Sequence, residues 1–310
     1  MPNTVTFSVF IDGLCREGMI SRAWRVLEMM IEKGVPPNVY TYNAFIDRYC
    51  LEGQMGKATK MLGTMVSMGC APNVHTYSIL INGYCKSRRL DEAKRLFDEM
   101  PRKRLTPNTV TYTTLMRGWC QVGRPRDALE LFKEMCSCGL LPDLITYSIL
   151  LDGLCKHGLF DDALRLLKQM EESKVEPDVF IYNILIDGLC IVGMLKVARK
   201  LFSDLPVKGM RPDVVTCTVM IQGLLKEGQT NEALKLFRKM EGEGILPDSC
   251  SYNVIIHGFL WNSDPSNAIQ LIKEMVNKGF SADSTTFQLL LDRVNDNEII
   301  SRFLLGSSQE

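Results

Sequence analysis

The 310-residue sequence lacks an excess of charge of either sign, because 36 Lys and Arg residues are balanced by 36 Asp and Glu residues. Bulk charge alone therefore cannot hold this protein on a nucleic acid, although a local basic stripe is compatible with the balance. No apolar run approaches the roughly 18 residues that a transmembrane helix needs, so the sequence predicts no membrane partner.

Targeting segments are missing as well. The opening residues MPNTVTFSVF contain neither the basic region nor the apolar core of a secretory signal, and they lack the Arg- and Ser-rich character of an organelle transit peptide. Asn3 resembles the last residue of a preceding repeat unit. We therefore expect the chain to be a fragment or a truncated gene product.

Histidine is scarce, with three residues, and none of the eleven cysteines belongs to a C-x-x-C motif. A structural metal site needs four closely spaced ligands, so the sequence predicts no metal and no cofactor. Six cysteines lie 35 residues apart, at Cys15, Cys50, Cys85, Cys120, Cys155 and Cys190. Leu225 and Leu260 take the next two places, so cysteine serves there as a small buried hydrophobe, and we expect a reduced, intracellular chain.

One pattern recurs every 35 residues without an insertion or a deletion. It divides the chain into eight windows: 4–38, 39–73, 74–108, 109–143, 144–178, 179–213, 214–248 and 249–283. An alanine takes the same place in every window: Ala23, Ala58, Ala93, Ala128, Ala163, Ala198, Ala233 and Ala268. A fixed period of this size is typical of a solenoid, in which each unit buries its apolar face on its neighbours.

Each window contains two apolar stripes at helical spacing. In window 74–108 the first stripe consists of Tyr77, Leu80, Ile81 and Tyr84, and the second of Ala93, Leu96, Phe97 and Met100. Six of the eight windows have Gly at the place of Arg88, between the stripes, and seven have Pro near their end. Gly and Pro end helices, so we predict a helix–turn–helix hairpin in each window and an all-α solenoid as the fold.

A polar stripe on the first helix is not explained by the core. The fifth residue of each window is always Ser, Thr or Asn: Ser8, Asn43, Ser78, Thr113, Ser148, Asn183, Thr218 and Asn253. The closing residue is always Asn or Asp: Asn38, Asn73, Asn108, Asp143, Asp178, Asp213, Asp248 and Asp283. Helix capping explains part of the closing series, but the fifth residue avoids better helix formers, which indicates a ladder of hydrogen-bonding sites.

The runs VTYTTLMRGWCQVG, ITYSILLDGLCKHG and DEAKRLFDEM closely resemble the pentatricopeptide repeat family, of the plain 35-residue type found in plant organelles. The resemblance covers 4–283, and residues 284–310 resemble a partial ninth unit that we expect to act as a C-terminal cap. The "DGLCK" run is most similar to the fertility-restorer-like branch, whose members are chiefly mitochondrial, with plastids as the alternative location. The tetratricopeptide pattern is absent.

The resemblance implies a right-handed superhelix whose first helices line the concave face and bind single-stranded RNA, one base per repeat, through the fifth and closing residues. It implies that the second residues sandwich the bases: Val5, Tyr40, His75, Val110, Ile145, Phe180, Val215 and Cys250. The thirteenth residue of the window lies on the same helix face as the fifth and is basic in four windows. These four residues are the expected phosphate contacts: Arg16, Lys86, Lys156 and Lys226. Recruited RNA-processing proteins are further partners that the resemblance suggests.

Base preference follows from the hydrogen-bonding capacity of the closing residue. Ionised Asp only accepts, so it suits U or G, whereas Asn can donate and suits C or A. By the family's rule, Asn at the fifth place suits pyrimidines and Ser or Thr suits purines. With RNA parallel to the chain, the predicted site is 5′-A-(C/U)-A-G-G-U-G-U-3′.

Two other functions compete with RNA binding. A protein-binding scaffold would use the same solenoid, but it would not need the restricted residues at the fifth and closing places. A zinc deaminase would need an H-x-E motif, which none of His75, His157 and His257 begins, and only one helix and a short stub at 297–305 follow residue 283. We therefore predict no enzyme, no catalytic residues and no small-molecule substrate.

Overall fold

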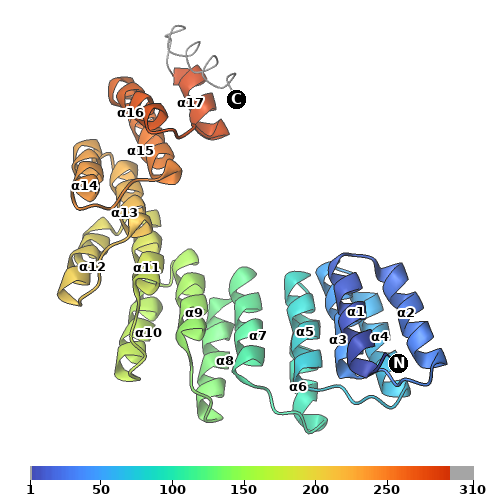
Figure 1. The fold of residues 1–310 in the computed structure, drawn as a ribbon. Helices are drawn as coiled ribbons and strands as arrows, with labels where there is room; N and C mark the ends of the chain where they lie inside the picture. The colour runs from blue at the N-terminus through green and yellow to red at the C-terminus, as the bar shows by residue number, and fades with distance from the viewer. Residues whose placement is uncertain (1, 294–310) are drawn as a thin grey trace. The chain divides into compact units, whose positions relative to one another are not determined.

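The computed structural model describes residues 2–293, which form seventeen α-helices and no strand. The first helices of the windows are α1 (Thr4–Arg16), α3 (Val39–Leu51), α5 (Val74–Lys86), α7 (Thr109–Gln121), α9 (Leu144–Lys156), α11 (Val179–Ile191), α13 (Val214–Lys226) and α15 (Ser249–Trp261) (Figure 1). The second helices are α2 (Ile20–Glu32), α4 (Met55–Ser67), α6 (Leu90–Arg102), α8 (Pro125–Ser137), α10 (Phe160–Glu172), α12 (Leu195–Val207), α14 (Thr230–Gly242) and α16 (Pro265–Asn277). Helix α17 (Ser284–Arg293) follows, and the stub at 297–305 lies outside the described residues.

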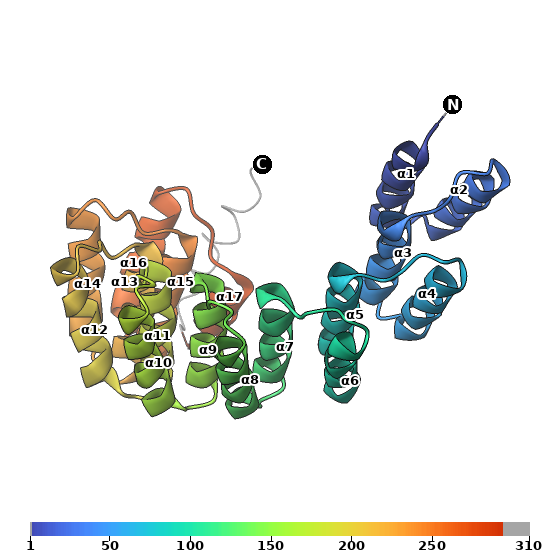
Figure 2. The same ribbon diagram turned by 90° about the horizontal axis from the view of Figure 1, so that it is seen from below.

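The helices assemble into two compact units, residues 1–157 and 158–310. In the first unit α1, α3, α5, α7 and α9 pack on one another in order, and in the second unit α11, α13, α15 and α17 do the same. Figure 2 shows this stacking from below. The predicted all-α solenoid is confirmed within each unit, while the right-handed superhelix stays a prediction from the resemblance.

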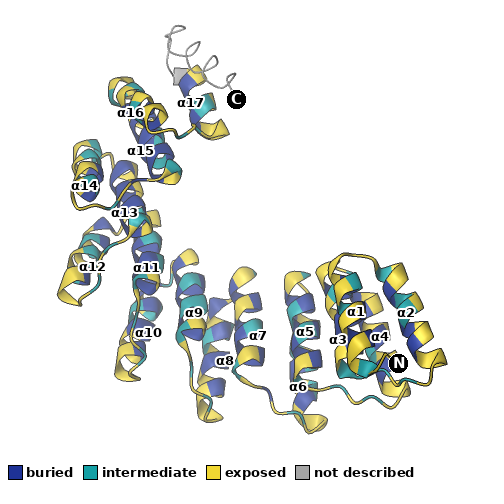
Figure 3. Ribbon diagram, in the orientation of Figure 1, coloured by how far each residue is buried: buried dark blue, intermediate teal, exposed yellow. Residues whose placement is uncertain are grey.

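The core of each unit is built from the apolar stripes that the sequence predicts (Figure 3). All eight recurring alanines are fully buried. The methionine that ends most second helices is buried too, as core filler rather than a ligand. Aromatic rings join successive windows, as where Phe97 meets Tyr112 edge to face at a centroid distance of 4.9 Å.

The two turns of each window need a left-handed residue, and most windows use glycine there. Where glycine is missing, the backbone keeps the same conformation: φ is 57° at Arg88 and 59° at Lys174. A side chain in this region is strained by roughly 1–2 kcal/mol. The packing of the helices therefore imposes the turn, and glycine relieves its strain.

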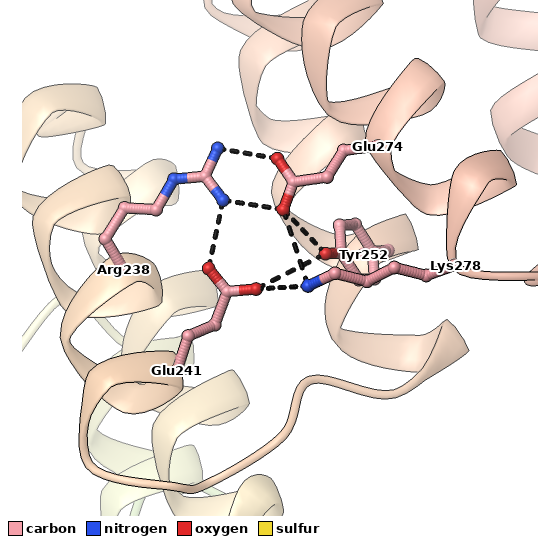
Figure 4. A network of polar contacts seen from close by, with 5 residues as sticks. All are labelled: Arg238, Glu241, Tyr252, Glu274 and Lys278. Carbon is pink, nitrogen blue, oxygen red and sulfur yellow. Dashed lines mark hydrogen bonds and ion pairs between the residues drawn. The ribbon is translucent and has the colours of Figure 1, made fainter.

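A polar network joins windows 214–248 and 249–283 on the side of the second helices (Figure 4). Both terminal nitrogens of Arg238 lie 2.7 Å from the Glu274 carboxylate, which also accepts a 2.8 Å hydrogen bond from the Tyr252 hydroxyl. Lys278 lies 2.5 Å from Glu241, which pairs in turn with Arg238. The Arg238 hydrogen bonds hold the pKa of Glu274 below its usual value. Such shared ion pairs fix the register of neighbouring windows more firmly than isolated surface pairs would.

Successive first helices approach closely where the recurring cysteine faces a glycine of the next window. A Cβ atom added to Gly118 would lie 2.5 Å from Cys85 Sγ, and one added to Gly83 would lie 2.6 Å from Cys50 Sγ. Burial raises the pKa of the Cys85 thiol to about 12, so the thiol stays protonated. The prediction that these cysteines are small buried hydrophobes is confirmed.

This contact predicts opposite outcomes for two glycine substitutions. Gly118→Ala should lower the free energy of unfolding by about 1–3 kcal/mol, because the new methyl group overpacks a rigid crossing. Gly63→Ala is the control, since nothing lies within 4 Å of a Cβ added there. It should raise stability by about 0.5–1 kcal/mol through helix propensity. Urea unfolding measures both, and equal effects of the two substitutions would refute the close approach.

Candidate nucleic-acid interface

Every closing residue caps the first helix of the next window. Asn38 Oδ1 accepts the Thr41 backbone N–H at 3.0 Å, and Asp143 Oδ1 accepts that of Thr146 at 2.8 Å. The same bond precedes α1, α5, α7, α11, α13, α15 and α17. Short side chains with an oxygen (Asn, Asp, Ser and Thr) cap at this place, so capping explains why the closing residue is short and polar but not why Ser and Thr are absent.

Asn and Asp both cap the helix through Oδ1, so the cap does not use the second terminal atom of the side chain. In residues 2–293, no hydrogen bond joins the second side-chain atom of Asn73, Asn108 or Asp143 to another group. That atom is an NH₂ group in Asn and a carboxylate oxygen in Asp. The closing residues are exposed, apart from the half-buried Asn38. The atom in which the two residue types differ is therefore the one available to a ligand.

A buried hydroxyl connects the fifth residue of a window to its closing residue. Thr76 Oγ1 lies 2.8 Å from the amide oxygen of Asn43 and 3.1 Å from Asn73 Oδ1. Equivalent contacts join Ser8 to Thr41 at 2.8 Å and Thr218 to Ser251 at 2.7 Å.

Sequence reasoning missed these bridging residues. They are the third residues of the windows, Thr41, Thr76, Thr111, Thr146 and Ser251, together with Thr286, whereas Thr216 contacts only Asp213. The sequence does contain a signal for them, because the third residue of each of the eight windows is Thr or Ser, with Ile181 as the exception.

The fifth residues are buried, except the half-buried Ser148. Two of them hold an amide atom that is buried without a hydrogen-bond partner: Nδ2 of Asn43 and Oδ1 of Asn183. Leaving such a group unpaired costs about 1–3 kcal/mol. These two atoms are the buried unsatisfied polar groups of the fifth residues.

The second residues form an exposed row beside the closing residues. The six large apolar members, Val5, Tyr40, Val110, Ile145, Phe180 and Val215, have exposed fractions between 54% and 75%. His75 and Cys250 complete the row and are exposed too. Apolar side chains repeated on a surface mark a contact face rather than a core, and flat rings among them can stack on bases.

Three of the four basic residues predicted to contact phosphates already have a partner within the protein. Arg16 pairs with Asp12 at 3.0 Å, and Lys156 pairs with Asp152 at 2.8 Å. Lys226 Nζ contacts the Ile191 carbonyl oxygen. Exposed pairs of this kind contribute at most about 1 kcal/mol, so a phosphate can replace the acid.

Two other kinds of site are absent from the described part of the chain. No helix between residues 2 and 293 is long and apolar enough to cross a membrane. Over the same residues, no group of three or more His, Cys, Asp or Glu side chains is arranged to hold a metal ion.

The shared capping atom predicts how closing residues tolerate substitution. Asp143→Asn should change the free energy of unfolding by only a few tenths of a kcal/mol, because the amide oxygen can cap as the carboxylate does. Asp143→Ala should cost about 1 kcal/mol, the usual value of a lost cap. Thermal or urea unfolding distinguishes them. If Asn is as costly as Ala, the interchangeable cap is wrong.

The solved structures most informative for comparison are those of a plant repeat protein. The crystal structure of the pentatricopeptide repeat protein PPR10 from maize is similar to this chain, with a TM-score of 0.59 and 23% identity, over 99% of this chain and 53% of that one. PPR10 in complex with an 18-nt psaJ RNA element gives a TM-score of 0.57 and 22% identity, over 99% and 56% of the two chains. This chain spans about half the length of PPR10, and the likeness shows the fold. No curated protein matches the sequence significantly.

The model of the PPR repeat family matches nearly the whole chain. Its eight overlapping matches cover residues 2–50, 41–86, 79–121, 107–156, 150–191, 177–226, 212–260 and 247–294. They follow the 35-residue period and the helix pairs described above. The chain belongs to the pentatricopeptide repeat family.

Proposed function

We propose that the chain binds single-stranded RNA on a base-reading surface formed by the second, fifth and closing residues of each window. One observation carries the proposal: closing residues such as Asn73, Asn108 and Asp143 cap a helix with one atom and leave a second atom without a hydrogen bond, beside an exposed second residue. The reported RNA complex of PPR10, which shares the fold, agrees with it.

The free atom of the closing residue supplies base selectivity. A carboxylate oxygen, as at Asp213, accepts a hydrogen bond from N3–H of uracil or N1–H of guanine. An amide NH₂, as at Asn73, donates to N3 of cytosine or N1 of adenine. Because Asn and Asp cap alike, a window can change its preferred base without changing its fold.

The second residues supply stacking that is independent of base identity. Each base would lie between the second residues of neighbouring windows, and the rings of Tyr40 and Phe180 offer the largest flat surfaces. Stacking on an aromatic side chain contributes about 1–3 kcal/mol per base. The pairs then specify 5′-A-(C/U)-A-G-G-U-G-U-3′, one base per window from the N-terminal end. We propose that this binding serves RNA processing, stability or translation in an organelle, the mitochondrion or the plastid.

An unbiased RNA selection with the purified chain tests the proposal directly. The enriched motif should match the predicted site, and Asp213→Asn should move the preference at the sixth base from U toward C. The U-to-C affinity ratio at that base should fall about tenfold, as expected for a lost charge-assisted hydrogen bond. Asp143→Asn is the matched control and should act at the fourth base alone. Selection without a motif would favour a protein-binding scaffold.

The salt dependence of binding should be shallow. Four basic residues face the expected phosphates, and each phosphate neutralised on a single strand contributes about −0.7 to the slope of log K against log salt. The slope should therefore be no steeper than about −3. Lys86→Gln should reduce it by about one phosphate, whereas Lys60→Gln, on helix α4, should not change it. A slope several times steeper would contradict this surface.

A further inference from the structure

The thirteenth residue of the window alternates in charge along the chain. It is basic in the first, third, fifth and seventh windows, where it is an expected phosphate contact. In the other four windows it is uncharged: Leu51, Gln121, Ile191 and Trp261. The three apolar members have exposed fractions between 50% and 59%. A single exposed apolar side chain needs no explanation, but two of these three meet at one place.

Ile191 and Trp261 line a cavity of about 240 Å³ in the second unit. Its walls come from α11, α13 and α15, which pack on one another in this order (Figure 1). Val219 and Val254 are further apolar walls. Drug-sized ligands fill pockets of roughly 300–1,000 Å³, so this cavity suits a smaller group such as a single nucleobase.

The cavity lies on the same helix face as the predicted stacking row. The second, sixth, ninth and thirteenth residues of a window are spaced by four, three and four positions, so they share one face of a helix. On α13 they are Val215, Val219, Gln222 and Lys226. The cavity therefore begins about one helical turn, or roughly 6 Å, beyond the second residue. RNA that stacks on the second residues would lie beside its opening.

The indole of Trp261 is the best stacking surface in this part of the protein. Its ring meets the His257 ring at a centroid distance of 5.7 Å, and 59% of the residue is still exposed. The second residues of the seventh and eighth windows are Val215 and Cys250, which offer no ring to a base. Bases of every kind stack on aromatic side chains. A base between these two windows therefore stacks better in the cavity than in the row.

The polar groups of the cavity match the rest of a nucleotide. Lys226 Nζ contacts the neutral carbonyl oxygen of Ile191, and its positive charge can attract a phosphate. Gln222 both donates and accepts, so it can meet the hydrogen-bonding edge of any base. Asp187 also lines the cavity, on α11, where its negative charge disfavours a phosphate. The anionic group of a ligand therefore belongs at Lys226, on α13.

We propose that this cavity is a nucleobase-binding site outside the row that reads one base per window. It holds one nucleotide that no reading pair contacts, with the base on Trp261 and the phosphate at Lys226. The inference rests on the proposed RNA-binding function. Because Lys226 and Trp261 belong to the seventh and eighth windows, the target RNA can carry one extra nucleotide between the bases that these two windows read.

RNAs with one inserted adenosine test the site. The parent RNA is the motif that selection with the whole chain enriches, and the adenosine is inserted between its seventh and eighth bases or between its third and fourth. The first insertion should change Kd by less than about threefold. The second should weaken binding about tenfold or more, because it displaces a stacked base. Equal losses from both insertions would overturn the site.

Substitution of the indole tests which side chain accommodates the insertion. Trp261→Ala should weaken binding of the RNA with adenosine between the seventh and eighth bases about tenfold relative to the parent RNA. Trp261→Phe keeps a ring and should restore most of that ratio. Leu51→Ala is the matched control, because Leu51 is exposed at the thirteenth place of the second window. Urea unfolding of each variant identifies a general loss of stability, which would weaken both RNAs alike.

Adenosine 5′-monophosphate probes the cavity without RNA. The indole N–H signal of Trp261, identified by its loss in Trp261→Phe, should shift in NMR spectra at millimolar nucleotide. Lys226→Gln should weaken this response several-fold, and the signal of the buried Trp119 should not move.

The outcomes separate the two proposals. If selection enriches no RNA but the nucleotide still shifts the Trp261 signal, the proposed function fails and the cavity keeps its role. If RNA binds through the reading pairs, but neither the inserted adenosine nor the nucleotide depends on Trp261, the cavity proposal alone is overturned, in favour of a protein partner at this place.

Discussion

The helix cap at the closing residue is the interaction on which both the fold and the proposed function depend. It starts each first helix at a fixed residue and joins one window to the next, as Asn38 does for α3. It also aims the remaining side-chain atom outward. Because Asn and Asp provide the capping oxygen equally well, helix capping and the proposed base preference would reside on different atoms of one side chain. Under this proposal, a repeat can change its preferred base without a change to its core.

The 35-residue period was enough to predict the fold. The apolar stripes located both helices of each window, and replacement of cysteine by Leu225 identified a buried place. Within the candidate site, the resemblance supplied the second, fifth and closing residues. The pairing of Arg16 and Lys156 with acids four residues earlier could have been read from the sequence too, since that spacing joins side chains on a helix.

Other parts of the site could not be predicted because they depend on contacts between windows. The hydroxyl of Thr76 reaches an amide 33 residues away, and a single window gives no indication of that contact. The orientation of an amide is harder still, since Asn183 and Asn253 occupy the same place in their windows but have different hydrogen-bond partners. A residue pattern does not record which hydrogen-bond partners lie near a side chain in the folded protein.

The contact between the recurring cysteine and the following glycine also governs how repeats can be rearranged. A window that has glycine at its tenth place can follow any window that ends its core stripe in Cys or Leu, as Gly258 follows Leu225. Window 39–73 instead has Arg48 at that place, and its guanidinium reaches back to Gly18 of the preceding window. At this contact the units of the array are thus interchangeable in recombination or engineering, apart from this one, which is matched to the neighbour it already has.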